Sequence, residues 1–223
     1  MEGKRNKRKQ GPGFMRFYRP NFLLRSFVPD SIWTTPESGV LVTIDDGPSG
    51  RNTEAILRAL REVNCTAVFF CTGKNADDNQ NMVQEIKAEG HEIANHGWNH
   101  SKHIFMNRSE LEKSIITTSK LLSGITGEAV TFYRPPYGLP GIYQNRILKK
   151  LKMKNVMWSL LSYDFEGNDV LSREIISEEL RSDDIVVFHD NEKSSKVFPE
   201  ILYYLAEVAE KKKYKFADPR CLK

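Results

Sequence analysis

The most constraining feature of this 223-residue chain is a regular alternation of short apolar runs with longer amphipathic segments between residues 39 and 215. The apolar runs are rich in β-branched and aromatic residues, which is typical of buried strands. We therefore expect strands at residues 40–44, 67–71, 91–95, 131–134, 156–162 and 185–188, and a further short one near Tyr214.

The segments between these runs have helical periodicity, and they predict helices at residues 53–63, 79–89, 109–122, 141–152, 172–181 and 198–211. Strands that are apolar along their whole length and alternate with helices indicate a mainly parallel sheet covered by helices. Six or seven such units in a chain of about this size favour an α/β fold in the form of a distorted (β/α) barrel with about seven parallel strands, rather than an open doubly wound sheet.

Composition indicates one globular domain at residues 15–223, because 39% of the residues are hydrophobic and 28% are charged. The formal net charge of +4 is concentrated at the start, where residues 1–10 carry five basic and one acidic side chain. We interpret residues 1–14 as a disordered basic head or an expression remnant. The remaining charge is balanced, which argues against a nucleic-acid partner.

The three cysteines, Cys65, Cys71 and Cys221, form no C-x-x-C pair, so they indicate neither a disulfide framework nor a cysteine zinc site. No segment reaches the roughly 18 apolar residues that span a bilayer, so no membrane span is expected. As written, the sequence predicts a cytoplasmic location, unless a signal or anchor has been removed. It leaves the oligomeric state open.

Polar side chains follow five of the expected strands. They are Asp45 and Asp46, His96 and His100, the segment 134–138, Asp164, and His189 with Asp190. The carboxyl ends of parallel strands meet at one edge of a barrel, where such proteins carry their active sites. These side chains are therefore expected to converge.

His96 and His100 lie four residues apart, a spacing that suits a divalent metal but is weak evidence alone, because paired surface histidines are common. An aspartate from another strand end would complete a three-ligand zinc site with open positions for water and substrate. His103 is interpreted as a surface residue or a support for the ligands, and His91 as structural.

Five segments occur in the order of the motifs of polysaccharide deacetylases, the NodB-homology or carbohydrate esterase family 4 domain, which the chain resembles over about residues 39–215. The segments are Thr43-Ile-Asp-Asp-Gly-Pro48, His96-Gly-Trp-Asn-His100, Arg134-Pro-Pro-Tyr-Gly138, the segment around Asp164, and Val187-Phe-His189. The resemblance implies a distorted barrel that removes acetyl groups from acetylated carbohydrates with a divalent metal, most commonly Zn²⁺, with Co²⁺, Ni²⁺ or Mn²⁺ as alternatives.

The resemblance also implies a role for each residue. Asp45 would be the general base, and Asp46 would bind the metal with His96 and His100. Arg134 would orient Asp45. The backbone N–H of Tyr137 would help to hold the oxyanion. His189 would be the general acid, with Asp164 holding its imidazole.

Substrate contacts are expected from Pro136 and Tyr137 and from the aromatic rings of Trp98 and Phe165, whereas Trp158 is expected in the core. Two departures from the family pattern stand out. Leu161 replaces the first aspartate of the fourth motif and Phe165 its tryptophan, which changes the groove wall. Gly97 replaces a Ser or Thr, so a hydrogen bond that braces the loop is expected to be absent.

The leading hypothesis is removal of N-acetyl groups from chitin oligomers or peptidoglycan-type glycans by metal-activated water. O-acetyl carbohydrate ester hydrolysis, cleavage of a small amide, and a catalytically silent sugar-binding module remain as alternatives. Nucleic-acid binding by the basic head ranks below them.

Overall fold

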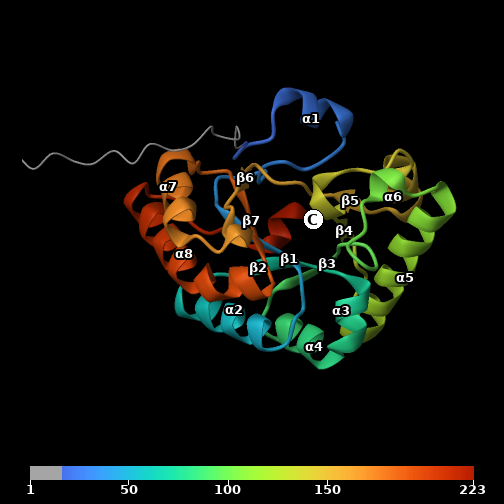
Figure 1. The fold of residues 1–223 in the computed structure, drawn as a ribbon, viewed down its shortest axis with the longest axis horizontal. Coiled ribbons are helices and arrows are strands. Elements are labelled where there is room, and N and C mark those ends of the chain that lie inside the picture. Colours follow the sequence, from blue (N-terminus) through green and yellow to red (C-terminus); the bar gives the residue numbers. More distant parts are fainter. Residues whose placement is uncertain (1–16) are drawn as a thin grey trace, which may run out of the picture.

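The structure, a computed structural model, describes residues 17–223, so the head expected at residues 1–14 lies outside the described residues. Its centre is a parallel sheet of seven strands in the spatial order β5-β4-β3-β2-β1-β7-β6 (Figure 1). The strands are β1 Leu41–Asp46, β2 Ala67–Cys71, β3 Glu92–Asn95, β4 Phe132–Tyr133, β5 Lys154–Asn155, β6 Leu160–Leu161 and β7 Ile185–His189.

This order is the sequential order of a (β/α) barrel with one opening, which lies between β5 and β6. The segment before β1 contacts both edges of the opening. The Ile32 N–H donates to the Asn155 carbonyl of β5 at 2.8 Å, and the Leu161 N–H of β6 donates to the Tyr18 carbonyl at 2.9 Å. The expected distorted barrel with seven parallel strands is confirmed.

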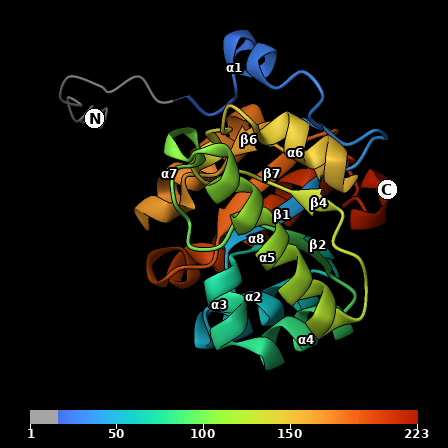
Figure 2. The same ribbon diagram turned by 90° about the vertical axis from the view of Figure 1, so that its right-hand side faces the viewer.

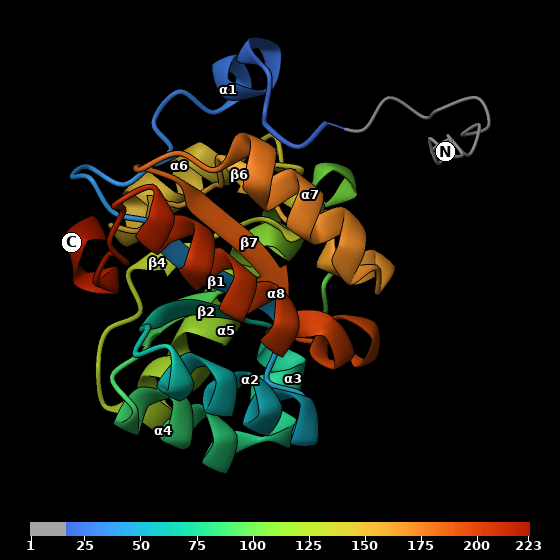
Figure 3. The ribbon, with the colours of Figure 1, turned by 90° about the vertical axis from the view of Figure 1, so that its left-hand side faces the viewer.

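Seven helices cover the outside of the described sheet, and α1 (Phe22–Phe27) stands apart from them. They are α2 Arg51–Glu62, α3 Gly73–Asp78, α4 Gln80–Ala88, α5 Arg108–Thr126, α6 Gln144–Leu151, α7 Asp169–Glu179 and α8 Glu192–Lys211. Figure 2 shows α5 on the side of α3 and α4, and α5 contacts both of these helices. Figure 3 shows α8 between α2 and α7, and α8 contacts both of them. No helix within residues 17–223 is long and apolar enough to cross a membrane.

The two faces of β1 separate the core into an outer and an inner layer. Val42 and Ile44 pack with the helices in the main hydrophobic cluster, whereas Leu41 belongs to a smaller cluster inside the barrel with Phe70 and Phe132. Neighbouring residues of a strand point to opposite faces, so the apolar run of β1 must serve both layers.

The structure corrects several expected elements. Residues 156–162 do not form one strand, because β5 ends at Asn155 and β6 begins at Leu160, and these two strands lie at opposite edges of the sheet. The strand near Tyr214 is reduced to a single bridge between Val40 and Phe216. Helix α8 begins six residues earlier than expected, at Glu192, because the side chain of Asn191 accepts hydrogen bonds from the first free N–H groups of the helix.

Candidate active site

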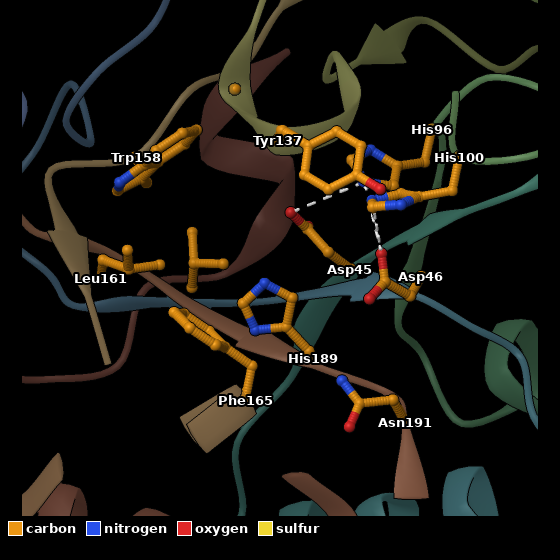
Figure 4. Close-up of a pocket in the computed structure, with 12 residues that line it drawn as sticks. Asp45, Asp46, His96, His100, Tyr137, Trp158, Leu161, Phe165, His189 and Asn191 are labelled. Carbon is orange, nitrogen blue, oxygen red and sulfur yellow. Dashed lines mark ion pairs between the residues drawn. The ribbon is translucent and has the colours of Figure 1, made fainter. Parts of the chain in front are cut away.

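The polar strand ends converge on one cavity of about 390 Å³ (Figure 4). The pairing of β1 with β7 places Asp45 directly beside His189, which accounts for the meeting of two segments 144 positions apart. The cavity is lined by Asp45, Asp46, His96, His100, Tyr137, Gly138, Trp158, Leu161, Phe165, Val187, His189 and Asn191.

Asp46, His96 and His100 form a compact group, with one possible ligand atom from each lying within 4.8 Å of the others. The Asp46 Oδ1 lies 3.0 Å from the His100 Nε2 and 3.6 Å from the His96 Nε2. The Nδ1 of His96 lies 2.9 Å from the Arg134 carbonyl oxygen, to which it can only donate. This contact fixes the tautomer in which the His96 Nε2 lone pair faces Asp46.

These three side chains fit a divalent metal. The Asp46 Oδ1 is buried and has no hydrogen bond of good geometry, although it faces two imidazole nitrogens. Burial by itself would raise the pKa of Asp46, but the close contact with the His100 imidazole and the charges of the nearby histidines lower it to about 2. An ionised carboxylate and two neutral imidazoles are the donor set of a catalytic zinc site.

Three non-glycine residues that line the cavity have backbone φ angles in the left-handed region, which residues other than glycine rarely adopt. The φ angles are 79° at Asp46, 52° at His100 and 59° at Tyr137. Such conformations cost roughly 1–3 kcal/mol each and persist where the surroundings impose them, often at functional sites. The backbone is therefore held in an unfavourable form at three points around the cavity.

Asp45 is fixed by a buried arginine. The Nη1 of Arg134 lies 2.7 Å from the Asp45 Oδ1 and 2.8 Å from the Thr43 hydroxyl, and the remaining guanidinium nitrogens donate to backbone carbonyls. The guanidinium also lies 4.0 Å from the centre of the Phe70 ring. Because Oδ1 is held in this way, Oδ2 is directed toward the metal-ligand group, 3.9 Å from the His96 Nε2.

His189 is held by Asp164 through two contacts. The Asp164 Oδ1 lies 2.8 Å from the His189 Nδ1, and its Oδ2 accepts from the His189 backbone N–H at 2.7 Å. The Ser162 hydroxyl also donates to Asp164. Burial opposes a charged imidazole, but Asp164 outweighs it and raises the pKa of His189 to about 9. The other ring nitrogen, Nε2, is left for the cavity.

We expect the Asp164→Asn variant to lower the pKa of His189 from about 9, because the imidazole loses its hydrogen-bonded carboxylate while burial still opposes its charge and only Asp46 and Asp45 still favour it. The measurement is a pH titration of the His189 imidazole by NMR. The raised pKa also means that His189 stabilises the fold below about pH 6.5, and this stabilisation is lost as the pH rises through 9. Asp169→Asn, an exposed change in α7, is the control, and an unchanged titration in Asp164→Asn would contradict the assigned cause.

Not every predicted substrate contact lies at the cavity. The rings of Tyr137 and Phe165 line it, and Phe165 meets His189 edge to face at 5.3 Å between ring centres. Pro136 is buried in the loop and does not line the cavity. Trp98 turns away and packs over Gly73, where an added Cβ would lie 2.3 Å from its indole. Neither Pro136 nor Trp98 lines this cavity, so contact of either with a substrate stays a prediction.

Sequence reasoning assigned Leu161 and Phe165 to the groove wall but missed two further apolar residues that line the cavity, Trp158 and Val187. Together these four residues form an apolar wall of the cavity, and Figure 4 shows Trp158, Leu161 and Phe165 on the side of His189 that is away from the metal-ligand group. Trp158 was expected in the core, but it lies against the loop at Gly138, where an added Cβ would come within 1.9 Å of the indole. Leu161 pairs with Val187, two residues before His189, so strand register would have revealed it.

The loop that carries His96 is braced despite the glycine at position 97. The Gly97 N–H donates to the buried Asn95 side chain at 2.7 Å, and the Trp98 N–H donates to the Ser114 hydroxyl at 2.9 Å. His103 is buried beneath Gly97 and hydrogen-bonds the Tyr133 hydroxyl, so it supports the loop and is not a surface residue. These contacts brace the loop without a side chain at position 97.

Asp190, which sequence reasoning had given no role, supports the loop after β1. Its backbone N–H donates to the Asp45 carbonyl at 2.8 Å. Its buried carboxylate accepts hydrogen bonds from the Ser49 N–H and from the hydroxyl groups of Ser49 and Thr53. Burial raises the pKa of Asp190. This network joins β7 to the turn that positions Asp45 and Asp46.

The chain belongs to the polysaccharide deacetylase family, whose model matches residues 33–157. It is 39% identical over 131 residues to a peptidoglycan-N-acetylglucosamine deacetylase of Bacillus cereus, an alignment that covers 57% of this chain and 46% of that protein. A chitooligosaccharide deacetylase of Azorhizobium caulinodans is 30% identical over 160 residues, covering 70% of this chain and 76% of the relative.

The fold agrees with a crystal structure of a peptidoglycan N-acetylglucosamine deacetylase in complex with a hydroxybenzamide-type compound. The TM-score is 0.82 and the identity 26%, with 89% of this chain and 94% of the other covered. The chain spans less than half the length of the Bacillus cereus relative described first.

Proposed function

We propose that the protein hydrolyses the N-acetyl group of N-acetylated amino sugars, in chitin oligomers or peptidoglycan-type glycans, with a divalent metal that we take to be Zn²⁺. The observation that carries this proposal is the arrangement of three functions around one cavity. A metal-ligand group, a fixed carboxylate and a protonated imidazole each contribute a free polar atom to it.

Asp45 has the geometry of a general base. Its Oδ1 is occupied by Arg134, whereas its Oδ2 faces the metal-ligand group and can accept a proton from an attacking water molecule. The guanidinium holds this carboxylate in one orientation and opposes its rotation. Because the carboxylate is already held in one orientation, less conformational entropy is lost when the reacting groups are aligned.

His189 has the geometry of a general acid. Its raised pKa keeps a proton on the imidazole at neutral pH, and Asp164 directs Nε2 to the cavity. A departing amine needs a proton, and an imidazole on the opposite side of the site from the base can supply it. Asp45 and His189 are neighbours across two strands, so both can reach one amide bond.

Asp46, His96 and His100 would hold the metal, which supplies Lewis-acid polarisation of the amide oxygen when bound. The backbone of Tyr137, held at φ 59°, lies next to this group, because the Tyr137 ring contacts the His100 ring with 4.4 Å between centres. In this position its N–H would share the developing negative charge on the oxygen.

The substrate class is supported by the relatives, which are named as deacetylases of peptidoglycan N-acetylglucosamine and of chitooligosaccharides. Aromatic rings at the mouth of the cavity suit the apolar faces of sugars, and Tyr137 is 55% exposed there. The choice of an amide over an ester rests on His189, since an amine is a poor leaving group without a proton donor.

The test is acetate release from a panel that contains chitin oligomers, peptidoglycan fragments and acetylxylan, each with defined metals. We expect release from the first two, loss of release with a chelator, and recovery on addition of Zn²⁺. Release from acetylxylan alone would identify an O-acetyl esterase instead. Binding of glycans without turnover under any metal would identify a silent sugar-binding module.

A further inference from the structure

Asn191 lines the cavity but has no part in the reaction proposed above. It follows β7 and lies two residues after His189 in the sequence. The carboxylates and imidazoles of the lining are the metal-ligand group, the base and the acid. Among the described residues that line the cavity, the polar side-chain groups left for a substrate are the Asn191 amide, the Tyr137 phenol and the Trp158 indole N–H. Of these, Asn191 is the one that the chain joins to His189.

The orientation of the Asn191 amide is fixed by the start of α8. Its Oδ1 accepts hydrogen bonds from the Lys193 N–H at 3.0 Å and from the Ser194 N–H at 3.1 Å. A backbone N–H can only donate, so the oxygen of the amide must face the helix and the nitrogen must face away from it. The Asn191 carbonyl also accepts from the Ser195 N–H at 3.0 Å. Both the main chain and the side chain of Asn191 are therefore held.

The amide nitrogen of Asn191 is left for a ligand. Within the part of the chain that the structure describes, no group accepts a hydrogen bond from its Nδ2. Figure 4 shows this nitrogen on the side of His189, and the oxygen on the opposite side. An amide nitrogen carries two donors and no acceptor. It can therefore bind an oxygen atom of a ligand in the cavity while the helix cap stays intact.

The first turn of α8 is also anchored to the part of the fold that carries the base. The Ser195 hydroxyl donates to the Asn52 side-chain oxygen at 3.0 Å. The Asn52 side-chain nitrogen donates in turn to the Ser49 hydroxyl at 3.2 Å, in the loop after β1. Asn191 is thus positioned before any ligand arrives. A donor that is held in advance loses little conformational entropy on binding.

We propose that Asn191 is a substrate-binding residue that favours acetamido sugars over simpler acetyl compounds, with its Nδ2 donating a hydrogen bond to a sugar oxygen. This proposal rests on the proposed function, in which His189 protonates the departing nitrogen. Each of the two ring carbons next to the one that bears this nitrogen carries an oxygen. A donor two residues from His189 is placed to meet one of these oxygens. The apolar wall of the cavity cannot supply that contact.

The alternative is that Asn191 serves only as the cap of α8. The chain offers a matched comparison, because Asn107 caps α5 by accepting from the Glu110 N–H at 3.0 Å but does not line the cavity. Serine caps a helix about as well as asparagine does, whereas alanine does not. Replacement by serine therefore removes the amide nitrogen and keeps the cap, and replacement by alanine removes both.

The first test is steady-state acetate release from a chitin oligomer. We expect Asn191→Ser to raise KM roughly 3- to 10-fold, with the effect in KM rather than in kcat, because one neutral hydrogen bond to the bound sugar is lost. Asn191→Ala should raise KM by the same factor and also lower the melting temperature by roughly 2–4 °C, since it loses the cap. The preference for the chitin oligomer over 4-nitrophenyl acetate, which has no sugar oxygen, should fall in both variants.

Equilibrium binding tests the same contact without turnover, so this proposal and the proposed function can fail separately. Calorimetry with the zinc-loaded Asp45→Asn protein gives a Kd for the chitin oligomer. Adding Asn191→Ser to this protein should raise the Kd roughly 3- to 10-fold. Asn107→Ser is the control and should change neither KM nor Kd. Binding that depends on Asn191 without acetate release from the wild type would contradict the proposed function alone.

Three results would overturn the assignment of Asn191. Unchanged KM and Kd in both Asn191 variants would leave the residue as a helix cap only. A rise of KM in Asn191→Ala but not in Asn191→Ser would trace the effect to the cap. An equal fall of kcat/KM for the chitin oligomer and for 4-nitrophenyl acetate would indicate general damage to the site and no contact with the sugar. If no form of the protein bound the glycan, both proposals would be wrong.

Discussion

The Asp45→Asn variant is expected to lower kcat/KM for acetate release by roughly 10³- to 10⁴-fold, at the upper end of the effect of a general base. Asparagine keeps the shape of the side chain and one oxygen for Arg134, but its amide cannot accept the proton. The measurement is steady-state acetate release from a chitin oligomer at saturating metal. Zn²⁺ binding should be largely retained, because Asp45 is not one of the three grouped ligands.

This substitution also weakens a buried ion pair, so a loss of stability has to be separated from a loss of chemistry. Breaking such a pair costs roughly 3–5 kcal/mol. Asp184→Asn is the matched control, because Asp184 is buried, pairs with Arg19 at 2.8 Å, and lies just before β7 rather than at its carboxyl end. It should lose comparable stability in a thermal melt and keep its activity. If both variants lost activity to the same extent, the loss in Asp45→Asn would reflect lower stability, and Asp45 would not be the general base.

The Asp46→Asn variant is expected to lower Zn²⁺ affinity by at least about 100-fold, since even the loss of a residue behind a ligand costs 10–100-fold. Asp46 supplies the negative charge of the group, and its pKa of about 2 keeps it ionised throughout the pH range of an assay. The measurement is a competitive titration of the metal-free protein with a zinc chelator. Activity should fall with metal occupancy and recover in part at high Zn²⁺.

A histidine outside the group provides the control for this experiment. His91 is buried, and its Nδ1 accepts from the Ala67 N–H at 3.1 Å, a contact that the asparagine oxygen in His91→Asn can reproduce. The His91→Asn variant should bind Zn²⁺ as the wild type does. Unchanged affinity in Asp46→Asn would mean that the metal lies elsewhere.

The convergence of the proposed catalytic groups could be predicted because parallel strands end at a common edge. Asp45, His96, Arg134, Asp164 and His189 each follow a strand or end it, and the structure places all five around one site. The order of strands along the chain and the residue types at their ends were sufficient to predict that these side chains lie close together, since neither depends on the conformation of the loops.

Side-chain direction beyond the strand ends could not be predicted. Trp98 and Trp158 are both aromatic residues near the ends of apolar runs, yet Trp98 packs over Gly73 and Trp158 reaches the cavity over Gly138. Each indole occupies space that a Cβ would fill, so its position depends on a glycine from a distant segment. No local pattern carries that information.

The division of residues 154–161 between two edges of the sheet has the same cause. Val156 and Met157 are buried although they belong to no strand, so they are as apolar as β6 and the run 156–162 resembles one strand in sequence.

The sequence by itself therefore determined the class of fold, the set of chemical groups and their common edge, because hydrophobic periodicity and strand polarity are local properties. Only the tertiary structure decided which atoms remain free: the Oδ2 of Asp45, the Oδ1 of Asp46 and the Nε2 of His189. These outcomes depend on contacts between distant segments. A hydrogen bond from another segment occupies one polar atom of a side chain, as at the Asp45 Oδ1 and the His189 Nδ1, and the second polar atom is then left to face the cavity.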